Sequence, residues 1–335
     1  MTTTTAPTSG VTAGETTSHQ TRTDRGITLT NVTKSYGKQQ VLAGINLHLE
    51  PGKVYGLLGA NGAGKTTLMS VILNHTFRSS GQITIDGQNP AENARVLERT
   101  CFIHEDQRWH DDYLVKHILQ TLPHFYPRWQ SQLADRLLDR FSIPRETPLK
   151  KLSRGQRSAF AISIALACRT DYTFLDEPYL GLDPSARNIF YEELMREVAE
   201  HPRLILMSTH LIDEAANLLE EVILIRQGRV DLHAPVDEVT ANMTAVRGLD
   251  EAMDRFLNGH NLISSQALGR IRSVLIRGAL SPDDLELAAD LHLSVESPSL
   301  QEIVASLGTL DHPNGSASPF PEKFIGNYLN RGDRP

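Results

Sequence analysis

Residues 59–66 read Gly-Ala-Asn-Gly-Ala-Gly-Lys-Thr, the complete G-x-x-x-x-G-K-[ST] pattern of a phosphate-binding loop. Glycines let such a loop curl so that successive backbone N–H groups point at phosphate oxygens, and a following helix adds the positive end of its dipole. A glycine-rich turn without a ligand is the alternative, and a strand before and a helix after disfavour it. The predicted nucleotide-binding residues are Gly59, Asn61, Gly62, Ala63, Gly64, Lys65, Thr66 and Thr67.

Two carboxylates and a histidine follow apolar runs further along the chain. Asp176 and Glu177 end the run at 172–175, and His210 comes soon after the run at 204–207. Ligands bind at the carboxyl ends of parallel strands. Asp176 therefore fits a Mg²⁺ ligand, Glu177 fits a residue that orients or deprotonates water, and His210 could reach a terminal phosphate. A solvated turn and a packing histidine are the alternatives, and the phosphate loop weakens both.

Alternating strands and helices must position these groups. A buried strand is expected at 54–58, a helix at 67–74, and a further helix at 185–200 between the strands that precede the acidic pair and His210. This order indicates a parallel sheet with helices on both faces. Other expected elements are strands at 27–30 and 45–49 and helices at 111–140 and 156–168.

The character of the chain changes after about residue 239. Strands are expected at 244–247, 262–265, 273–277 and 293–296, and helices between them at 249–257 and 282–289. The order β-α-β-β-α-β predicts a split ferredoxin-like unit. We therefore expect a disordered tail at 1–25, a nucleotide-binding domain at 26–239, a small α+β domain at 240–310 and a flexible tail at 311–335.

The composition is that of a globular protein. Of the 335 residues, 40% are hydrophobic and 22% charged, and the formal charge of −7 gives no basic signature of nucleic-acid binding. We see no apolar run of membrane-spanning length and no secretory signal, so a membrane part would have to come from another chain. Cys101 and Cys168 are expected to be packing residues in a reducing cytoplasm.

Residues 152–156, Leu-Ser-Arg-Gly-Gln, complete a set of motifs. They resemble the ABC signature, usually LSGGQ, and the order of phosphate loop, signature, acidic pair and histidine resembles that of the ABC ATPase family over roughly residues 26–239. The resemblance implies an α/β P-loop NTPase of ABC type. Such a fold has a RecA-like core, an antiparallel β subdomain and an inserted helical subdomain, followed here by the small α+β C-terminal domain.

The resemblance also implies ATP and Mg²⁺ as ligands, and two nucleotide-binding domains paired head to tail as a homo- or heterodimer. Each ATP would lie between the phosphate loop of one domain and the signature of the other. A separate transmembrane permease, in an exporter-like arrangement, would be the further partner, with this chain lying peripherally on the cytoplasmic face of the membrane. The implied roles are adenine stacking for Tyr36, catalysis for Lys65, Glu177 and His210, metal binding for Thr66 and Asp176, contact with the partner's ATP for Ser153, Gly155 and Gln156, and communication across the dimer for Asp183.

Two positions depart from the family pattern. Arg154 replaces a signature glycine, but Gly155, the glycine expected nearest the phosphate, is kept. The family's Q-loop glutamine falls on Glu105 in the preferred register, where a carboxylate could still bind Mg²⁺, and Gln107 is the alternative.

Other interpretations stay open at this point. The aromatic residues of 125–129 suit either docking to a permease or packing within the helical subdomain. The chain as a whole could also be an ABC ATPase without a transport role, or a nucleotide-binding regulator that hydrolyses slowly.

Overall fold

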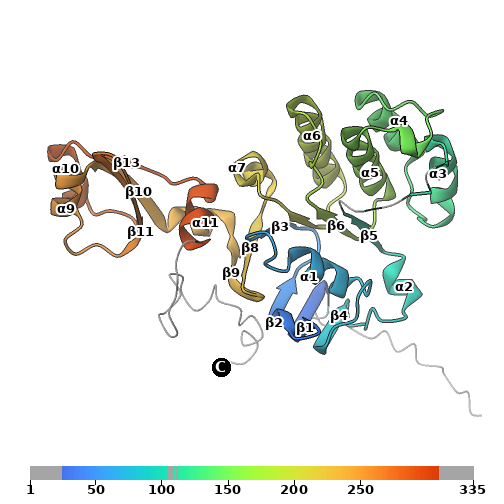
Figure 1. Cartoon of the computed structure of the whole chain (residues 1–335), viewed down its shortest axis with the longest axis horizontal. Helices are drawn as coiled ribbons and strands as arrows, with labels where there is room; N and C mark the ends of the chain where they lie inside the picture. The colour runs from blue at the N-terminus through green and yellow to red at the C-terminus, as the bar shows by residue number, and fades with distance from the viewer. Residues whose placement is uncertain (1–24, 105–106, 108, 111, 309–335) are drawn as a thin grey trace, which may run out of the picture.

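The computed structural model describes residues 25–104, 107, 109–110 and 112–308. The predictions for Glu105, for the tail at 311–335 and for all but the last residue of the tail at 1–25 therefore lie outside the described residues. Figure 1 shows an α/β body on its right-hand side and a smaller α+β unit on its left-hand side.

A six-stranded sheet forms the centre of the α/β body. Its order is β5-β6-β7-β3-β8-β9, and all neighbouring pairs are parallel except β8 with β9. The strands are β3 (Val54–Leu58), β5 (Thr100–Ile103), β6 (Tyr172–Asp176), β7 (Leu204–Ser208), β8 (Glu221–Arg226) and β9 (Arg229–Pro235). The parallel sheet predicted from the sequence is confirmed.

Helices cover both faces of this sheet. In β3, Val54 and Leu58 belong to the apolar cluster that contains α5 (Arg154–Cys168) and α6 (Pro184–Glu200), whereas Tyr55 and Leu57 belong to the cluster around α1 (Lys65–Ile72). Alternate residues of a strand face opposite sides, so a strand between two helical layers is apolar throughout.

Three antiparallel strands lie on the α1 side of the body (Figure 1). Their order is β2-β1-β4, with β1 at Ile27–Tyr36, β2 at Gln39–Leu49 and β4 at Ser80–Ile85. They form the predicted antiparallel β subdomain. A short helix, α2 (Ala94–Leu97), leads from them to β5.

The continuous helix predicted at 111–140 is wrong. The structure has α3 (Val115–Thr121), a 3-10 turn at Leu122–His124 and α4 (Ser131–Arg140). Pro123 and Pro127 fall between the two helices, and proline lacks the N–H that a helix interior needs. Of the aromatic residues there, Phe125 is 65% exposed, while Tyr126 and Trp129 pack against the core. The packing interpretation is thus confirmed for Tyr126 and Trp129, and docking to a permease stays a prediction for Phe125.

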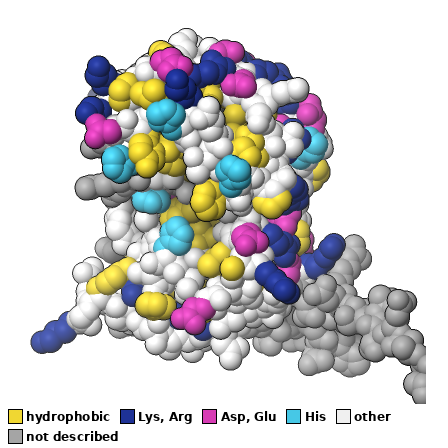
Figure 2. All heavy atoms as spheres, turned by 90° about the vertical axis from the view of Figure 1, so that its right-hand side faces the viewer, with side chains coloured by type: hydrophobic (Ala, Val, Ile, Leu, Met, Phe, Trp, Pro, Cys, Tyr) yellow, Lys and Arg dark blue, Asp and Glu magenta, His cyan; other side chains and the backbone are white. Residues whose placement is uncertain are grey.

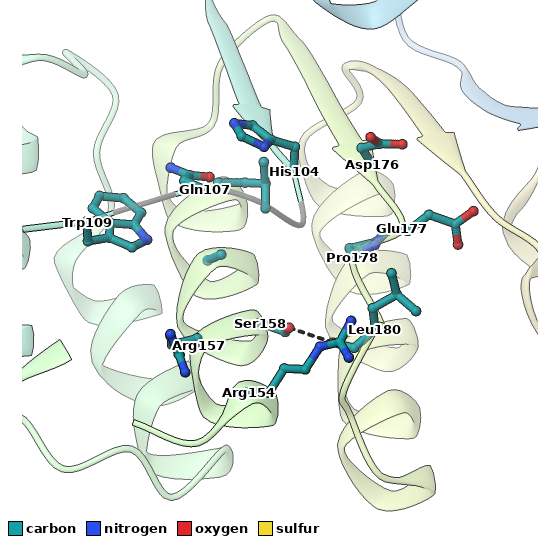
Figure 3. Close-up of a pocket in the computed structure, with 12 residues that line it drawn as sticks. His104, Gln107, Trp109, Arg154, Arg157, Ser158, Asp176, Glu177, Pro178 and Leu180 are labelled. Atoms are coloured by element: carbon teal, nitrogen blue, oxygen red, sulfur yellow. Dashed lines mark hydrogen bonds between the residues drawn. The ribbon is translucent and has the colours of Figure 1, made fainter. Parts of the chain in front are cut away.

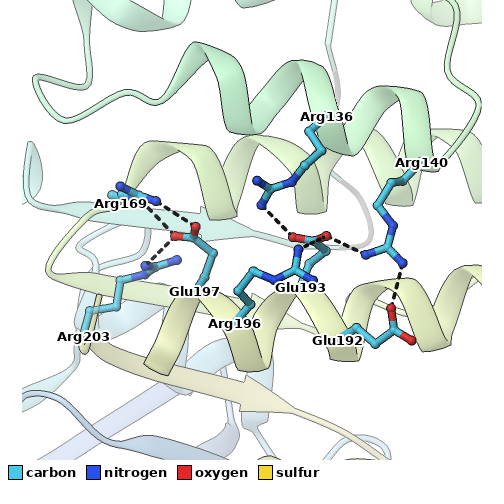
Figure 4. Close-up of polar contacts among 8 residues, drawn as sticks. All are labelled: Arg136, Arg140, Arg169, Glu192, Glu193, Arg196, Glu197 and Arg203. Atoms are coloured by element: carbon cyan, nitrogen blue, oxygen red, sulfur yellow. Dashed lines mark hydrogen bonds and ion pairs between the residues drawn. The ribbon is translucent and has the colours of Figure 1, made fainter. Parts of the chain in front are cut away.

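Ion pairs attach α4 to α6, as Figure 4 shows. Arg136 and Arg140 of α4 reach the fully buried carboxylate of Glu193 on α6. Further along α6, the buried Glu197 pairs with Arg169 and Arg203. The two helices are therefore joined by ion pairs to a buried carboxylate.

The C-terminal unit confirms the predicted β-α-β-β-α-β order. Its sheet has the order β11-β12-β10-β13 and is antiparallel throughout. Its elements are β10 (Met243–Leu249), α9 (Asp250–Phe256), β11 (Leu262–Leu268), β12 (Ile271–Arg277), α10 (Pro282–Asp290) and β13 (Ser294–Glu296). We define these residues, 243–296, as the C-terminal unit.

The sequence analysis did not predict α11 (Leu300–Gly308), a helix that follows the C-terminal unit. Its residues Leu300, Ile303 and Leu307 belong to the apolar cluster of the α/β body. It packs against α7 (Ile212–Ala215), α8 (Val236–Ala241) and β11. The chain thus returns to the body after the C-terminal unit. No helix in the described part of the chain is long and apolar enough to cross a membrane.

Phe256→Ala should destabilise the C-terminal unit by about 3–4 kcal/mol, because it removes a ring that is 1% exposed at the centre of a small separate cluster. In calorimetry we expect one unfolding transition to move to lower temperature while the transition of the α/β body stays in place. Leu268→Ala is the control, since Leu268 is 86% exposed. A single transition that moves as a whole would show that the unit does not unfold separately.

Candidate functional site

The phosphate loop runs from the end of β3 into α1, as predicted. Gly59 has φ +143°, and a Cβ there would lie 2.3 Å from the Ile225 carbonyl oxygen. Gly64 caps α1 with φ +107°, in the left-handed region that side chains rarely adopt. Glycine is therefore required at both positions, and the loop geometry is built into the backbone.

Lys65 begins α1 and points back over the loop. Its Nζ donates to the carbonyl oxygens of Gly59 at 2.8 Å and Ala60 at 3.3 Å, and the residue is only 7% exposed. These are neutral acceptors within the loop itself. The Lys65 ammonium group therefore lies over the loop, held by two backbone carbonyl oxygens.

Asp176, at the end of β6, is held by two hydroxyl groups. Thr66 donates to its Oδ2 at 2.5 Å, and Ser208 at the end of β7 donates to its Oδ1 at 2.6 Å. The Ser208 oxygen in turn accepts the Glu177 N–H at 2.9 Å. The sequence reading gave Ser208 no role, although its place at a strand end beside His210 was the signal that could have found it.

The carboxylate of Asp176 and the hydroxyl of Thr66 are hard oxygen donors, the type that Mg²⁺ prefers. They converge from β6 and α1, so two of the three predicted metal ligands lie together, while the third, Glu105, is not described. Over the described residues, no group of three or more His, Cys, Asp or Glu side chains could hold a metal by itself. This donor set fits an ion whose remaining ligands are phosphate oxygens and water.

Glu177 and His210 meet at the neighbouring strand ends. The His210 Nδ1 lies 2.7 Å from Glu177 Oε2, and Tyr179 contacts both residues through its hydroxyl. Glu177 has φ +48°, a left-handed conformation that is strained for a residue with a side chain. Tyr179 was missed in the sequence. The only available signal was an aromatic residue two positions after the acidic pair.

These groups border a cavity of about 640 Å³ at the carboxyl ends of the strands. Of the predicted residues, those that line it are Asn61, Gly62, Gly64, Lys65, Thr66, Thr67, Asp176, Glu177 and His210. The sheet topology therefore brings the phosphate loop, the acidic pair and the histidine to one place.

Tyr36 is not among the residues that line this cavity. It is 51% exposed at the end of β1, and the ammonium group of Lys34 lies 4.4 Å from its ring centroid. Gln39 and Val41 of β2 line the cavity instead.

The signature residues start α5. Ser153 caps the helix by accepting the Gln156 N–H at 3.1 Å, and the Gln156 side chain accepts the Ser153 N–H at 3.1 Å. A Cβ on Gly155 would lie 2.5 Å from the Gly181 carbonyl oxygen, so only glycine fits there. Asp183 likewise caps α6 through the Ala186 N–H at 2.8 Å. The cavity of one chain is thus not lined by four of the predicted binding residues of that same chain, Ser153, Gly155, Gln156 and Asp183.

A second cavity of about 310 Å³ adjoins the first, because both are lined by Arg154, Asp176, Glu177 and Leu180 (Figure 3). Gln107 lines this second cavity, and its buried Oε1 has no hydrogen-bond partner among the residues that the structure describes. The structure thus places Gln107 near the acidic pair. The choice between Glu105 and Gln107 as the Q-loop residue stays a prediction.

Comparisons with known proteins agree with these motifs. A family model described as ABC transporter matches residues 42–180. The chain is 26% identical over 251 residues to the ABC transporter ATP-binding protein YtrB of Bacillus subtilis, a match that covers 75% of this chain and 86% of that protein. It is 31% identical over 212 residues to the Nod factor export ATP-binding protein I of Paraburkholderia xenovorans, with 62% of this chain and 69% of that protein covered.

Solved structures share the fold at lower identity. An ATP-binding subunit of an ABC transporter matches with a TM-score of 0.59 and 23% identity, over 64% of this chain and 91% of that chain. A bacterial Atm1-family ABC exporter with ATP bound matches with a TM-score of 0.56 and 21% identity, over 64% of this chain and 39% of that chain. These similarities confirm the fold class expected from the sequence.

Proposed function

Since this chain belongs to the ABC transporter ATP-binding family, we propose that it binds ATP with Mg²⁺ in the 640 Å³ cavity and hydrolyses it there. One observation carries the proposal. Lys65, Thr66, Asp176, Glu177 and His210, which come from three separate segments of the sequence, all line this one cavity.

Thr66 and Asp176 would hold the Mg²⁺, because their oxygens are hard donors 2.5 Å apart beside the phosphate loop. Bound Mg²⁺ neutralises charge on the β- and γ-phosphate oxygens. The backbone N–H groups of the loop and the Lys65 ammonium group would bind the phosphates. Lys65 can turn from its two neutral carbonyl partners to the phosphates at little cost, since charged acceptors make stronger hydrogen bonds.

Glu177 would orient the attacking water and accept its proton as the water oxygen bonds to the γ-phosphorus. The bond from that phosphorus to the β–γ bridging oxygen breaks, giving ADP and phosphate. His210 lies 2.7 Å from Glu177 and would donate to the γ-phosphate as this charge moves. The protein's contribution is positioning and charge, because phosphoryl transfer needs little covalent help.

A second nucleotide-binding domain, of this chain or of a similar one, would complete the site. Ser153 and Gly155 begin α5 outside the cavity lining of their own chain, so their phosphate-binding geometry is available to a partner's ATP. Residues 26–239 would form this ATPase domain, and residues 240–310 a second domain whose last helix, α11, packs back on the ATPase domain.

A permease would dock on the side of the molecule that Figure 2 shows, where hydrophobic and histidine side chains are interspersed. Phe125 and Tyr113, 65% and 49% exposed, supply apolar area next to α3 and α4. The chain would then lie peripherally on the cytoplasmic face of the membrane.

The full chain, purified alone, should release phosphate from ATP in the presence of Mg²⁺, and an excess of EDTA should lower the rate about 100-fold or more. Phosphate release and ATP binding would be measured on the same preparation. Binding of ATP without any phosphate release, in the presence of Mg²⁺ and over a wide range of protein concentration, would argue against hydrolysis by this chain. Absence of ATP binding would argue against the whole proposal.

A further inference from the structure

Tyr179 lies behind the candidate catalytic groups, outside the cavity that they line. It belongs to the loop between β6 and α6, two residues after Glu177, and only 3% of its surface is exposed. The residues around the cavity include Glu177 and His210 but not Tyr179. Any influence of Tyr179 on bound ATP must therefore pass through its neighbours.

The Tyr179 hydroxyl connects two strand ends. It donates to the Glu177 carboxylate, which follows β6, and it accepts the backbone N–H of His210, which follows β7, at 2.7 Å. Its oxygen also lies 3.1 Å from the His210 Nδ1. The two rings meet edge to face, with centroids 5.3 Å apart and planes at 70°. One hydroxyl group thus fixes both the glutamate side chain and the main chain of the histidine.

The chemistry of the phenol suits this task. Burial raises the pKa of Tyr179 far above its ordinary value, and the hydrogen bond to Glu177 raises it further. The hydroxyl therefore keeps its proton and acts as a donor to the carboxylate. Charge-assisted hydrogen bonds of this kind are stronger than neutral ones, so the contact can hold the Glu177 side chain in one rotamer.

We propose that Tyr179 is a positioning residue for ATP hydrolysis, whose hydroxyl holds the Glu177 carboxylate and the His210 main chain in the arrangement that the reaction needs. The inference rests on the proposed function, in which Glu177 acts on the attacking water and His210 on the γ-phosphate. It adds a residue that does not line the cavity itself.

The loop that carries Tyr179 is fixed by its own main chain. The Leu182 N–H donates to the Tyr179 carbonyl oxygen at 3.0 Å, and the Leu180 N–H donates to the Glu177 carbonyl oxygen at 3.1 Å. The Tyr179 ring fills buried space beside His210. Tyr179→Phe keeps the ring and these main-chain bonds and deletes only the hydroxyl, so it separates positioning from packing.

In Tyr179→Phe we expect kcat to fall about 10- to 100-fold, the effect of losing one hydrogen bond to a charged group, with KM for ATP unchanged within about two-fold. Tyr191→Phe is the matched control. Tyr191 is buried on α6, and its hydroxyl has no hydrogen-bond partner in the described part of the chain, so its removal should leave kcat unchanged. An unchanged or raised kcat in Tyr179→Phe would overturn the proposal.

A double variant tests whether Tyr179 acts through Glu177. In the Glu177→Gln background, Tyr179→Phe should cause little further loss, because residues that act as a unit are not additive. Two independent losses that multiply would overturn the mechanism.

A measurement on the ligand-free chain does not depend on hydrolysis. The His210 amide should exchange with deuterium faster in Tyr179→Phe than in the wild type or in Tyr191→Phe, because its acceptor is gone. If the wild type fails to hydrolyse ATP, the proposed function fails, while this exchange rate still decides whether the hydroxyl holds His210. Equal exchange in the three proteins would overturn the proposal.

Discussion

Glu177→Gln should lower ATP hydrolysis by the full chain about 1,000-fold while ATP binding stays within about two-fold of the wild type. The amide has the shape of the carboxylate but cannot accept the proton of the attacking water. Glu177 lines the cavity without ligating the loop, so the phosphate-binding groups are left intact. Phosphate release under single-turnover conditions and binding of a fluorescent ATP analogue would measure the two quantities separately.

Glu200→Gln provides the control for that variant. Glu200 is an exposed glutamate at the C-terminal end of α6, so its loss of charge should change neither hydrolysis nor binding. Equal rates in wild type and Glu177→Gln would remove Glu177 from the chemistry and would point to another base.

Glu193→Gln should reduce the free energy of unfolding by about 3 kcal/mol. The Glu193 side chain is fully buried between α6 and α4, and its oxygens lie 2.5 to 2.9 Å from nitrogens of Arg136, Arg140 and Arg196. The substitution keeps the volume but leaves three guanidinium groups around a neutral amide. Urea unfolding followed by circular dichroism at pH 7 would measure the loss.

The stability difference between the wild type and Glu193→Gln should depend on pH. Burial by itself would raise the pKa of Glu193, but hydrogen bonds from Arg140 and Arg136 and the nearby positive charges hold it below its ordinary value of 4.5. The folded state therefore binds this proton less readily than the unfolded state, and the stabilisation is fully present above the unfolded pKa. The difference between wild type and variant should stay constant from pH 8 to about pH 5.5 and shrink as the pH falls below about 4.5.

Glu192→Gln is the matched control, since it changes the adjacent residue of the same helix. Glu192 also pairs with Arg140, at 2.7 Å, but its side chain is 56% exposed, so its loss should cost less than about 1 kcal/mol. Equal losses in the two variants would mean that burial of the Glu193 charge does not decide its contribution.

Local sequence determined the identity of the chemical groups and most of the elements that carry them. A glycine-rich loop needs particular backbone angles, and buried parallel strands need unbroken apolar runs. The loop can therefore be recognised within a few residues at Gly59–Thr66, and the buried strands can be recognised in the same way at β3, β6 and β7. The break at Pro123 and Pro127 was also visible locally, and the prediction of one helix at 111–140 gave these prolines too little weight.

Only the tertiary structure decided how separate segments meet. The short contacts of Ser208 with Asp176, of Tyr179 with Glu177 and His210, and of Arg136 with Glu193 depend on strand order and helix packing. No pattern in the sequence shows which side chains the strand order and the helix packing bring within hydrogen-bond distance. The packing of α11 on the α/β body was likewise decided only by the tertiary structure. The sequence of an amphipathic helix shows that the helix has an apolar face but not which surface that face will cover.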